Sequence, residues 1–149
     1  MRKHEKKEWT PRKNTGPSNE LLESYCDTKG GVTFAEAKLP DDPYPNPREI
    51  DGVRFTARVR KLKTWSRNDP EFQQQLFLAR QNHRAVEVIE VAIPLTRGAI
   101  GQIVVGAWIL EQRGIKARMV LVCPQGSPTI FRELLKKHRI EVWSPNYPA

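Results

Sequence analysis

The chain has 149 residues, of which 38% are hydrophobic and 28% are charged, so it holds enough apolar material for one compact domain and is too short for two. Its longest apolar run, residues 103–110, falls well short of the roughly 20 residues that a membrane-spanning helix requires. The N-terminus is charged and lacks the apolar core of a secretory signal. These features argue against a membrane protein and against a secreted protein.

The charge is strongly positive, with 25 Lys and Arg residues against 17 Asp and Glu and a net charge of +8. A small basic domain is suited to a polyanionic partner, nucleic acid first, and no membrane partner is expected. The alternative is that the positive charge serves only solubility.

The two cysteines, Cys26 and Cys123, are far apart and belong to no CxxC pair, and the three histidines are scattered. These residues cannot supply a zinc site. Both thiols are expected to be buried and reduced, which fits a cytoplasmic protein.

Residues 1–17 are rich in Lys and Arg and almost free of apolar side chains, which predicts a disordered basic arm in front of a single domain over residues 18–149. The domain is expected to begin with a helix that Ser18 or Asn19 caps and that the glycine pair at residues 30–31 ends. A strand over residues 32–37 and a proline-rich loop follow.

The clearest pattern in the chain is an alternation over residues 50–60. Val53 and Phe55 fall on one side of this segment, and Arg54 and Arg58 fall on the other. The alternation predicts one strand with an apolar face and a basic face.

The rest of the chain alternates between helix and strand patterns. A helix capped by Asp69 is predicted within residues 61–82, and the Val/Ile run at residues 85–93 is typical of a strand buried on both faces. The later elements are a helix over residues 98–112, a strand over 117–123, a helix from Ser127 to near His138 and a strand over 140–143. We therefore expect an α/β fold with a sheet flanked by helices.

Two acidic residues occupy apolar positions. Glu90 lies within the Val/Ile run, and Asp51 shares the parity of Val53 at the start of the alternating segment. A buried carboxylate needs a partner. Each acid could pair with an arginine, or the two could bind a divalent cation together if their strands are neighbours. Two carboxylates and a main-chain carbonyl suit Mg²⁺, which keeps several waters.

Three segments carry a resemblance to a known superfamily: REIDGVRF at residues 48–55, VEVIEV at 86–91 and RGAIGQ at 97–102. Together they resemble the PD-(D/E)xK restriction-endonuclease-like nucleases. From residue 18 to the end, the resemblance implies a restriction-endonuclease-like core with a central mixed sheet flanked by helices. The implied element order is helix-strand-strand-strand-helix-strand-helix-strand.

The same resemblance implies roles for individual residues. Asp51 and Glu90 would be catalytic acids that bind Mg²⁺ (or Mn²⁺), with the main-chain carbonyl of Val91 as a further ligand. Gln102, one turn into the next helix, matches a catalytic glutamine often found in nuclease members. The other explanation for this amide is a hydrogen bond from the helix to a loop.

The chain departs from the family at one catalytic position. The family places a lysine two residues after the second acid, on the same face of the strand, and this chain has Ala92 there. No lysine occurs between Lys63 and Lys116, and the guanidinium of Arg97 stays protonated and cannot act as a base. A divalent ion acidifies water by itself, so activity without the lysine remains an expectation.

Three functions follow from these observations. The first is a metal-dependent DNA endonuclease that hydrolyses phosphodiester bonds. The second, motivated by Ala92, is a catalytically degenerate nuclease-fold protein that acts as a DNA-binding or assembly subunit. The third is a basic RNA-binding protein whose two acids are paired with arginines. DNA is favoured over RNA, and a homodimer is a further expectation because family members often act as dimers. The residues expected to bind the phosphate backbone of the nucleic acid are Arg48, Arg54, Arg58 and Arg97.

Overall fold

The computed structural model describes residues 7–9, 17–39, 49–93, 95–124 and 129–145. Within these ranges the chain forms a seven-stranded sheet and four helices. Arg48, one of the residues predicted to contact nucleic acid, lies outside the described residues. No helix in the described ranges is both long enough and apolar enough to cross a membrane.

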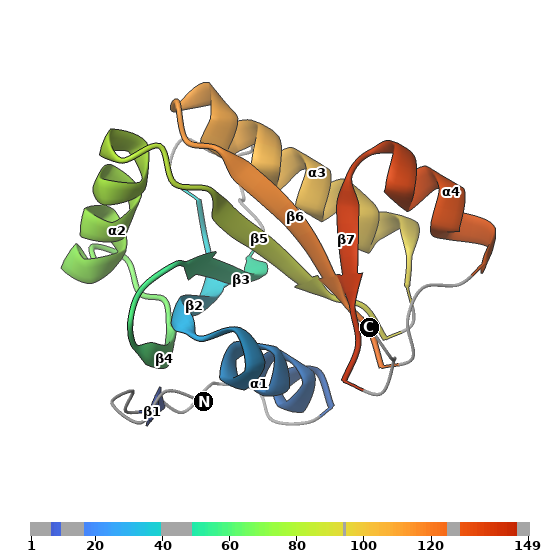
Figure 1. Ribbon diagram of the computed structural model, residues 1–149, viewed down its shortest axis with the longest axis horizontal. Coiled ribbons are helices and arrows are strands. Elements are labelled where there is room, and N and C mark those ends of the chain that lie inside the picture. The colour runs from blue at the N-terminus through green and yellow to red at the C-terminus, as the bar shows by residue number, and fades with distance from the viewer. Residues whose placement is uncertain (1–6, 10–16, 40–48, 94, 125–128, 146–149) are drawn as a thin grey trace.

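The elements follow one another in the order shown in Figure 1. They are β1 (Lys7–Trp9), α1 (Pro17–Lys29), β2 (Gly31–Ala37), β3 (Ile50–Phe55), β4 (Arg60–Thr64), α2 (Pro70–Gln81), β5 (Val86–Val91), α3 (Arg97–Gln112), β6 (Ala117–Val122), α4 (Thr129–Lys137) and β7 (Ile140–Trp143). Across the sheet the strand order is β1-β4-β2-β3-β5-β6-β7.

The sheet is mixed, and its centre is antiparallel. β3 pairs antiparallel with β2 on one side and with β5 on the other. The outer pairs, β1 with β4, β4 with β2, β5 with β6 and β6 with β7, are all parallel. The two strands that carry the acids Asp51 and Glu90 are therefore neighbours.

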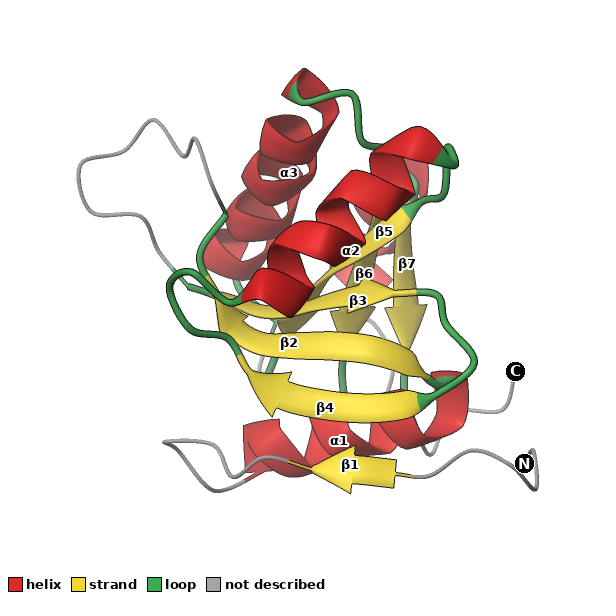
Figure 2. Ribbon diagram, turned by 90° about the vertical axis from the view of Figure 1, so that its left-hand side faces the viewer, coloured by secondary structure: helices red, strands yellow, loops and turns green. Residues whose placement is uncertain are grey.

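Helices cover both faces of the sheet, as Figure 2 shows for α1 below the strands and for α2 and α3 above them. The larger core cluster lies between the sheet and three helices, which contribute Phe72 from α2, Ile103 from α3 and Leu135 from α4. The smaller cluster lies under α1, which contributes Leu22 and Tyr25. The predicted α/β class, with a central mixed sheet flanked by helices, is confirmed.

The predicted element order is wrong in detail. β4 and α2 lie between β3 and β5, and β1 precedes α1. Without these three elements, the remaining ones follow the predicted order helix-strand-strand-strand-helix-strand-helix-strand. The two additional strands, β4 and β1, lie together at one edge of the sheet, beyond β2.

The alternation over residues 50–60 proves to span two strands. β3 ends at Phe55, and β4 begins at Arg60 on the far side of β2. Val59, which has the apolar parity, is 40% exposed, and its carbonyl accepts a hydrogen bond from the N–H of Gly31 (2.6 Å). An alternating pattern indicates which face of the sheet each side chain occupies. It does not indicate where a turn ends one strand and begins the next.

The structure differs in two places from the prediction of a disordered arm over residues 1–17. Lys7–Trp9 forms the edge strand β1, which pairs with β4, and α1 begins at Pro17. A three-residue edge strand contributes main-chain hydrogen bonds without needing an apolar side-chain pattern, so the sequence carries no periodic signal for it.

Two glycine substitutions should separate a strained position from a permissive one. Gly31 has a φ of +83°, and an added β-carbon would collide with the main-chain carbonyl oxygen of Phe55. We expect Gly31→Ala to lower the free energy of unfolding by about 2 kcal/mol or more. Gly101, in α3, has nothing within 4 Å of its added β-carbon. Gly101→Ala should raise the free energy of unfolding by up to about 1 kcal/mol. Urea denaturation measures both, and equal effects would contradict this account.

Candidate metal centre

Asp51 and Glu90 face each other across the two central strands. The pairs Arg54–Glu87, Val53–Val88 and Gly52–Ile89 fix the antiparallel register of β3 and β5. The next position in this register places Asp51 opposite Glu90, where β-carbons of opposed residues lie about 5 Å apart. The structure thus brings together the two acids that the sequence predicts as metal ligands.

The carboxylates lie where the main-chain ladder between β3 and β5 ends. The last ladder pair is Gly52–Ile89. Beyond it, the N–H of Val91 donates to Oδ2 of Asp51 (2.8 Å). The N–H of Asp51 donates to Oε1 of Glu90 (3.4 Å). Each acid therefore accepts a hydrogen bond from the strand that carries the other, and the pair occupies the seam at which the strands part.

Glu90 is the more deeply buried of the two acids, with only 4% of its surface exposed. Burial, the charge of Asp51 and a hydrogen bond between the two carboxyl groups raise the pKa of Glu90 to about 9. A main-chain hydrogen bond from Asp51 acts in the opposite direction and is the smallest of these effects. At neutral pH Glu90 therefore holds a proton, which lies in its hydrogen bond with Asp51.

Neither acid forms an ion pair with Lys or Arg in the part of the chain that the structure describes. Other acids do bind basic side chains: Glu87 pairs with Arg54, Glu71 with Lys61 and Lys63, Asp69 with Lys63, and Glu141 with Arg118. No basic group contributes to the shifted pKa of Glu90. Pairing with arginine, one of the two explanations for these acids, has no support among the described residues.

The main-chain carbonyl of Val91 faces the same seam. The N–H and the C=O of one strand residue leave the strand on the same side, and the N–H of Val91 reaches Asp51. On the opposite side, the N–H of Ala92 donates to the carbonyl of Val122 in β6. The Val91 carbonyl therefore lies beside the two carboxylates, past the end of the β3 ladder.

Helix geometry places Gln102 at the level of Glu90. An added β-carbon at Gly106 would lie 3.1 Å from Cγ1 of Val88, so α3 crosses β5 there. Gln102 lies one turn, about 6 Å, before Gly106, and Glu90 lies two residues, about 7 Å, after Val88. These steps point the same way because α3 runs back along the sheet between the parallel strands β5 and β6. The half-buried Gln102 therefore lies at the same level along the sheet as Glu90.

The predicted arginines divide between the two ends of the sheet. Arg97, the exposed first residue of α3, follows the end of β5 at which Glu90 lies. Arg58 is exposed in the connection after β3, at the opposite end.

Arg54 is largely committed to structural contacts. Its side chain, 11% exposed, pairs with Oε2 of Glu87 (3.0 Å). It also donates to the carbonyls of Gly30 (2.7 Å) and Lys29 (3.0 Å). These bonds cap the C-terminal end of α1.

One further acid, Glu36 near the end of β2, lies opposite Asp51 and was not predicted as part of the site. The pairs Ala35–Gly52 and Ala37–Ile50 bracket Glu36, which lies opposite Asp51. Glu36 is buried and has a φ of 56°, a left-handed conformation that is rare for residues with a β-carbon. Lys38 follows and is exposed. An acid inside an apolar strand, the signal that singled out Glu90, also marks Glu36 in the sequence.

The oxygen donors fit a hard divalent cation. Two carboxylates and a main-chain carbonyl are ligands that Mg²⁺ and Mn²⁺ accept while they keep several waters. Among the described residues, no group of three or more His, Cys, Asp or Glu side chains could hold a metal ion. A cation at this site would therefore take its remaining ligands from water and substrate.

Comparison with protein-family models, with curated proteins and with solved structures finds no match to this chain. The resemblance to the PD-(D/E)xK nucleases therefore stays a prediction from the sequence motifs.

Removing the charge at position 90 should change how stability depends on pH. Because the pKa of Glu90 is raised from 4.5 to about 9, the folded protein binds more protons than the unfolded chain between these values. The free energy of unfolding therefore falls as pH rises through this window. Glu90→Gln keeps the shape and the hydrogen bonding of the protonated acid and cannot ionise. We expect the thermal midpoint of the wild type to fall, relative to this variant, by about 10 °C or more between about pH 5 and about pH 9.

The control is Glu111→Gln, which removes an exposed carboxylate from α3. Its thermal midpoint should follow the wild type across the same pH range. If the thermal midpoints of the wild type and of Glu90→Gln depend on pH in the same way, Glu90 is ionised at neutral pH. The assignment of a proton to Glu90 would then be wrong.

Proposed function

We propose that this protein is a divalent-metal-dependent endonuclease that hydrolyses phosphodiester bonds in DNA. The observation that carries the proposal is the pair of opposed carboxylates, Asp51 and Glu90, with no Lys or Arg bound to either among the described residues. Two like charges at this separation need a proton or a cation between them. The net charge of +8 favours a polyanionic substrate.

The topology supports the restriction-endonuclease-like part of the proposal. Once β1, β4 and α2 are set aside, a helix, three strands with antiparallel neighbours, a helix and a parallel strand follow one another in the expected order. Asp51 lies at the start of the second of these strands and Glu90 near the end of the third. These are the positions that the resemblance assigns to the two metal-binding acids.

Each residue of the site has a distinct role in this proposal. A bound Mg²⁺ would polarise a phosphate oxygen and acidify a water molecule. Asp51 from β3, together with Glu90 and the Val91 carbonyl from β5, would hold the ion. The amide of Gln102 can donate to and accept from a water or phosphate oxygen above the sheet. Arg97, at the same end of the sheet, provides positive charge for the DNA backbone.

Ala92 favours the second function, a degenerate DNA-binding or assembly subunit. Its side chain is 3% exposed and belongs to the core on the α2–α4 side of the sheet. A methyl group can neither orient nor activate a water. Lys38, exposed at the end of β2, is the lysine that could take over this role if the protein cleaves DNA.

Binding of Mn²⁺ or Mg²⁺ should compete with the proton on Glu90. Isothermal titration calorimetry should show affinity rising with pH up to about 9, at most tenfold per pH unit, with protons released on binding. Asp51→Asn keeps an acceptor for the N–H of Val91 and removes a charge. This variant and Glu90→Gln should both lose binding, whereas Glu111→Gln should bind as the wild type does. Unchanged affinity in either site variant would remove these acids from the metal site.

Cleavage is tested with duplex and single-stranded DNA in the presence of Mg²⁺ or Mn²⁺. Asp51→Asn and Glu90→Gln should reduce the rate at least 100-fold, and Lys38→Gln should reduce it if this lysine replaces the missing one. Metal-dependent cleavage that both acid variants retain would refute the endonuclease assignment.

Ala92→Lys separates the two proposed functions. A wild type that binds DNA without cutting it, together with cleavage gained by Ala92→Lys, identifies the degenerate subunit. Cleavage by the wild type identifies the nuclease. Circular dichroism of the variant establishes that the buried substitution still folds.

A further inference from the structure

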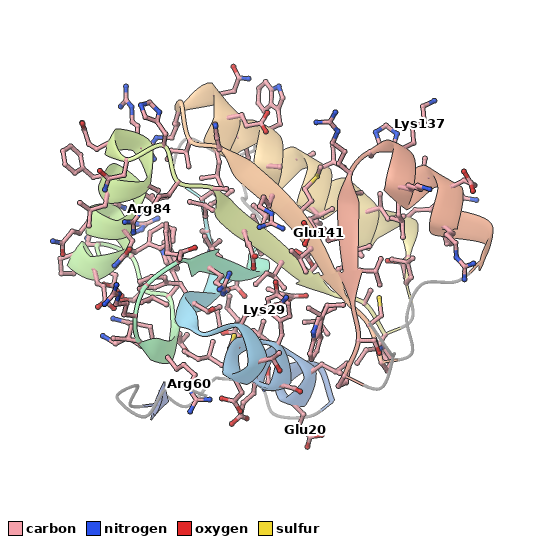
Figure 3. The ribbon with its side chains drawn as sticks, viewed as in Figure 1. Glu20, Lys29, Arg60, Arg84, Lys137 and Glu141 are labelled. Carbon is pink, nitrogen blue, oxygen red and sulfur yellow. The ribbon has the colours of Figure 1, made fainter. Side chains whose placement is uncertain are left out.

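A positively charged cavity lies at the opposite end of β3 from the acid pair. It has a volume of about 750 Å³ and opens between the end of α1, the β3–β4 connection and the α2–β5 connection. An adjoining hollow of about 440 Å³ shares Lys29, Arg54 and Arg84 with it. We call the two together the basic cavity. Its basic lining residues in the larger part are Lys29, Arg54, Arg58, Arg60 and Arg84, and Figure 3 labels three of them.

The basic cavity is separate from the acid pair. Asp51 and Thr56, which lines the cavity, are five residues apart on and just after β3, a distance of about 17 Å. Glu90 and Ala85, which lines the adjoining hollow, are five residues apart along β5. A ligand in the basic cavity would therefore not touch the candidate metal ligands.

Three of the cations in the basic cavity have no acidic partner among the described residues. Arg54 is balanced by Glu87, and Arg118 in the adjoining hollow is balanced by Glu141. Lys29, Arg58 and Arg84 are exposed and form no ion pair within those ranges, although Lys29 lies 6.0 Å from the ring of Tyr25. They come from three separate segments of the chain and line the same hollow, so an anion bound there is attracted by all three.

The end of α1 would repel an anion if its carbonyls were bare, because the C-terminal end of a helix carries partial negative charge. Arg54 donates to the carbonyls of Gly30 and Lys29, and Arg60 donates to the carbonyl of Asp27 (3.2 Å). These two buried or half-buried arginines neutralise the helix end. The three exposed cations are then left to act on a ligand.

We propose that the basic cavity binds the terminal phosphate groups of a nucleotide or of an oligonucleotide end. The volume is in the range of small-ligand sites, roughly 300–1,000 Å³. Guanidinium groups bind phosphate oxygens through paired hydrogen bonds, and the exposed hydroxyl of Thr56 adds a further donor. This site goes beyond the proposed hydrolysis and does not require it.

The test uses the full chain in EDTA, with ATP, pyrophosphate and adenosine as probes in calorimetric titrations. The cavity variant is Lys29→Gln/Arg58→Gln/Arg84→Gln. The matched control is Arg132→Gln/Lys136→Gln/Lys137→Gln, which removes the same charge from exposed positions of α4. We expect ATP and pyrophosphate to bind the wild type and adenosine not to bind. The cavity variant should lose at least tenfold in affinity, and the control less than threefold.

Two outcomes would overturn the proposal. One is an equal loss of affinity in both triple variants, which indicates general attraction to a basic protein. The other is no binding of any phosphate probe at millimolar concentration.

A 5′-phosphorylated and a 5′-hydroxyl oligonucleotide of one sequence distinguish the two sources of phosphate. Preference for the phosphorylated strand that the cavity variant loses assigns the site to nucleic-acid ends, and its absence, with ATP bound, assigns it to nucleotides. Asp51→Asn should leave ATP binding in EDTA unchanged, because Asp51 does not line the basic cavity. ATP binding therefore tests the basic cavity independently of the cleavage assay, which tests the nuclease proposal.

Discussion

The repulsion between two opposed carboxylates at the seam of β3 and β5 is the constraint on which the rest of the site depends. The strands bring Asp51 and Glu90 into direct opposition, and burial keeps water from screening them. A proton on Glu90 relieves the repulsion, as its pKa of about 9 indicates. A divalent cation would relieve it more strongly and would add the charge that a phosphodiester requires. The same geometry therefore explains both the proton and the proposed metal.

Two helices pack against the sheet on opposite faces near the acid pair. α1 covers the far face of the sheet, and α3 crosses β5 at the level of Val88, where its closeness depends on Gly106. Gln102 and Arg97 belong to the first turns of α3, nearest to the acids. The separate basic cavity lies at the other end of the same two strands. The acid pair and the three exposed cations of the basic cavity thus lie at opposite ends of β3 and β5.

Periodic features of the sequence predicted most of the elements, and strand pairing decided the rest. The Asp69–Pro70 helix start and the last strand over residues 140–143 could be predicted because their signals are local. Asp51 and Glu90 could be predicted as partners because an acid in an apolar strand is costly. The position of Glu36 opposite Asp51 depends on the pairing of β2 with β3, which no local pattern encodes. The structural role of Arg54 was likewise hidden, since exposed and buried arginines on one strand face look alike in sequence.

Arg54 and Glu87 are partners in the same ladder that sets Asp51 against Glu90, three positions away. The hydroxyl of Tyr25 donates to Oε1 of Glu87 (2.7 Å), so this ion pair is also tied to α1. A slip of β3 by one residue would break that attachment and turn every side chain of the strand to the opposite face. The attraction between Arg54 and Glu87 at one end of the ladder thus helps to hold the like charges of Asp51 and Glu90 together at the other end. The packing of α1 against the sheet becomes part of what keeps the two acids aligned.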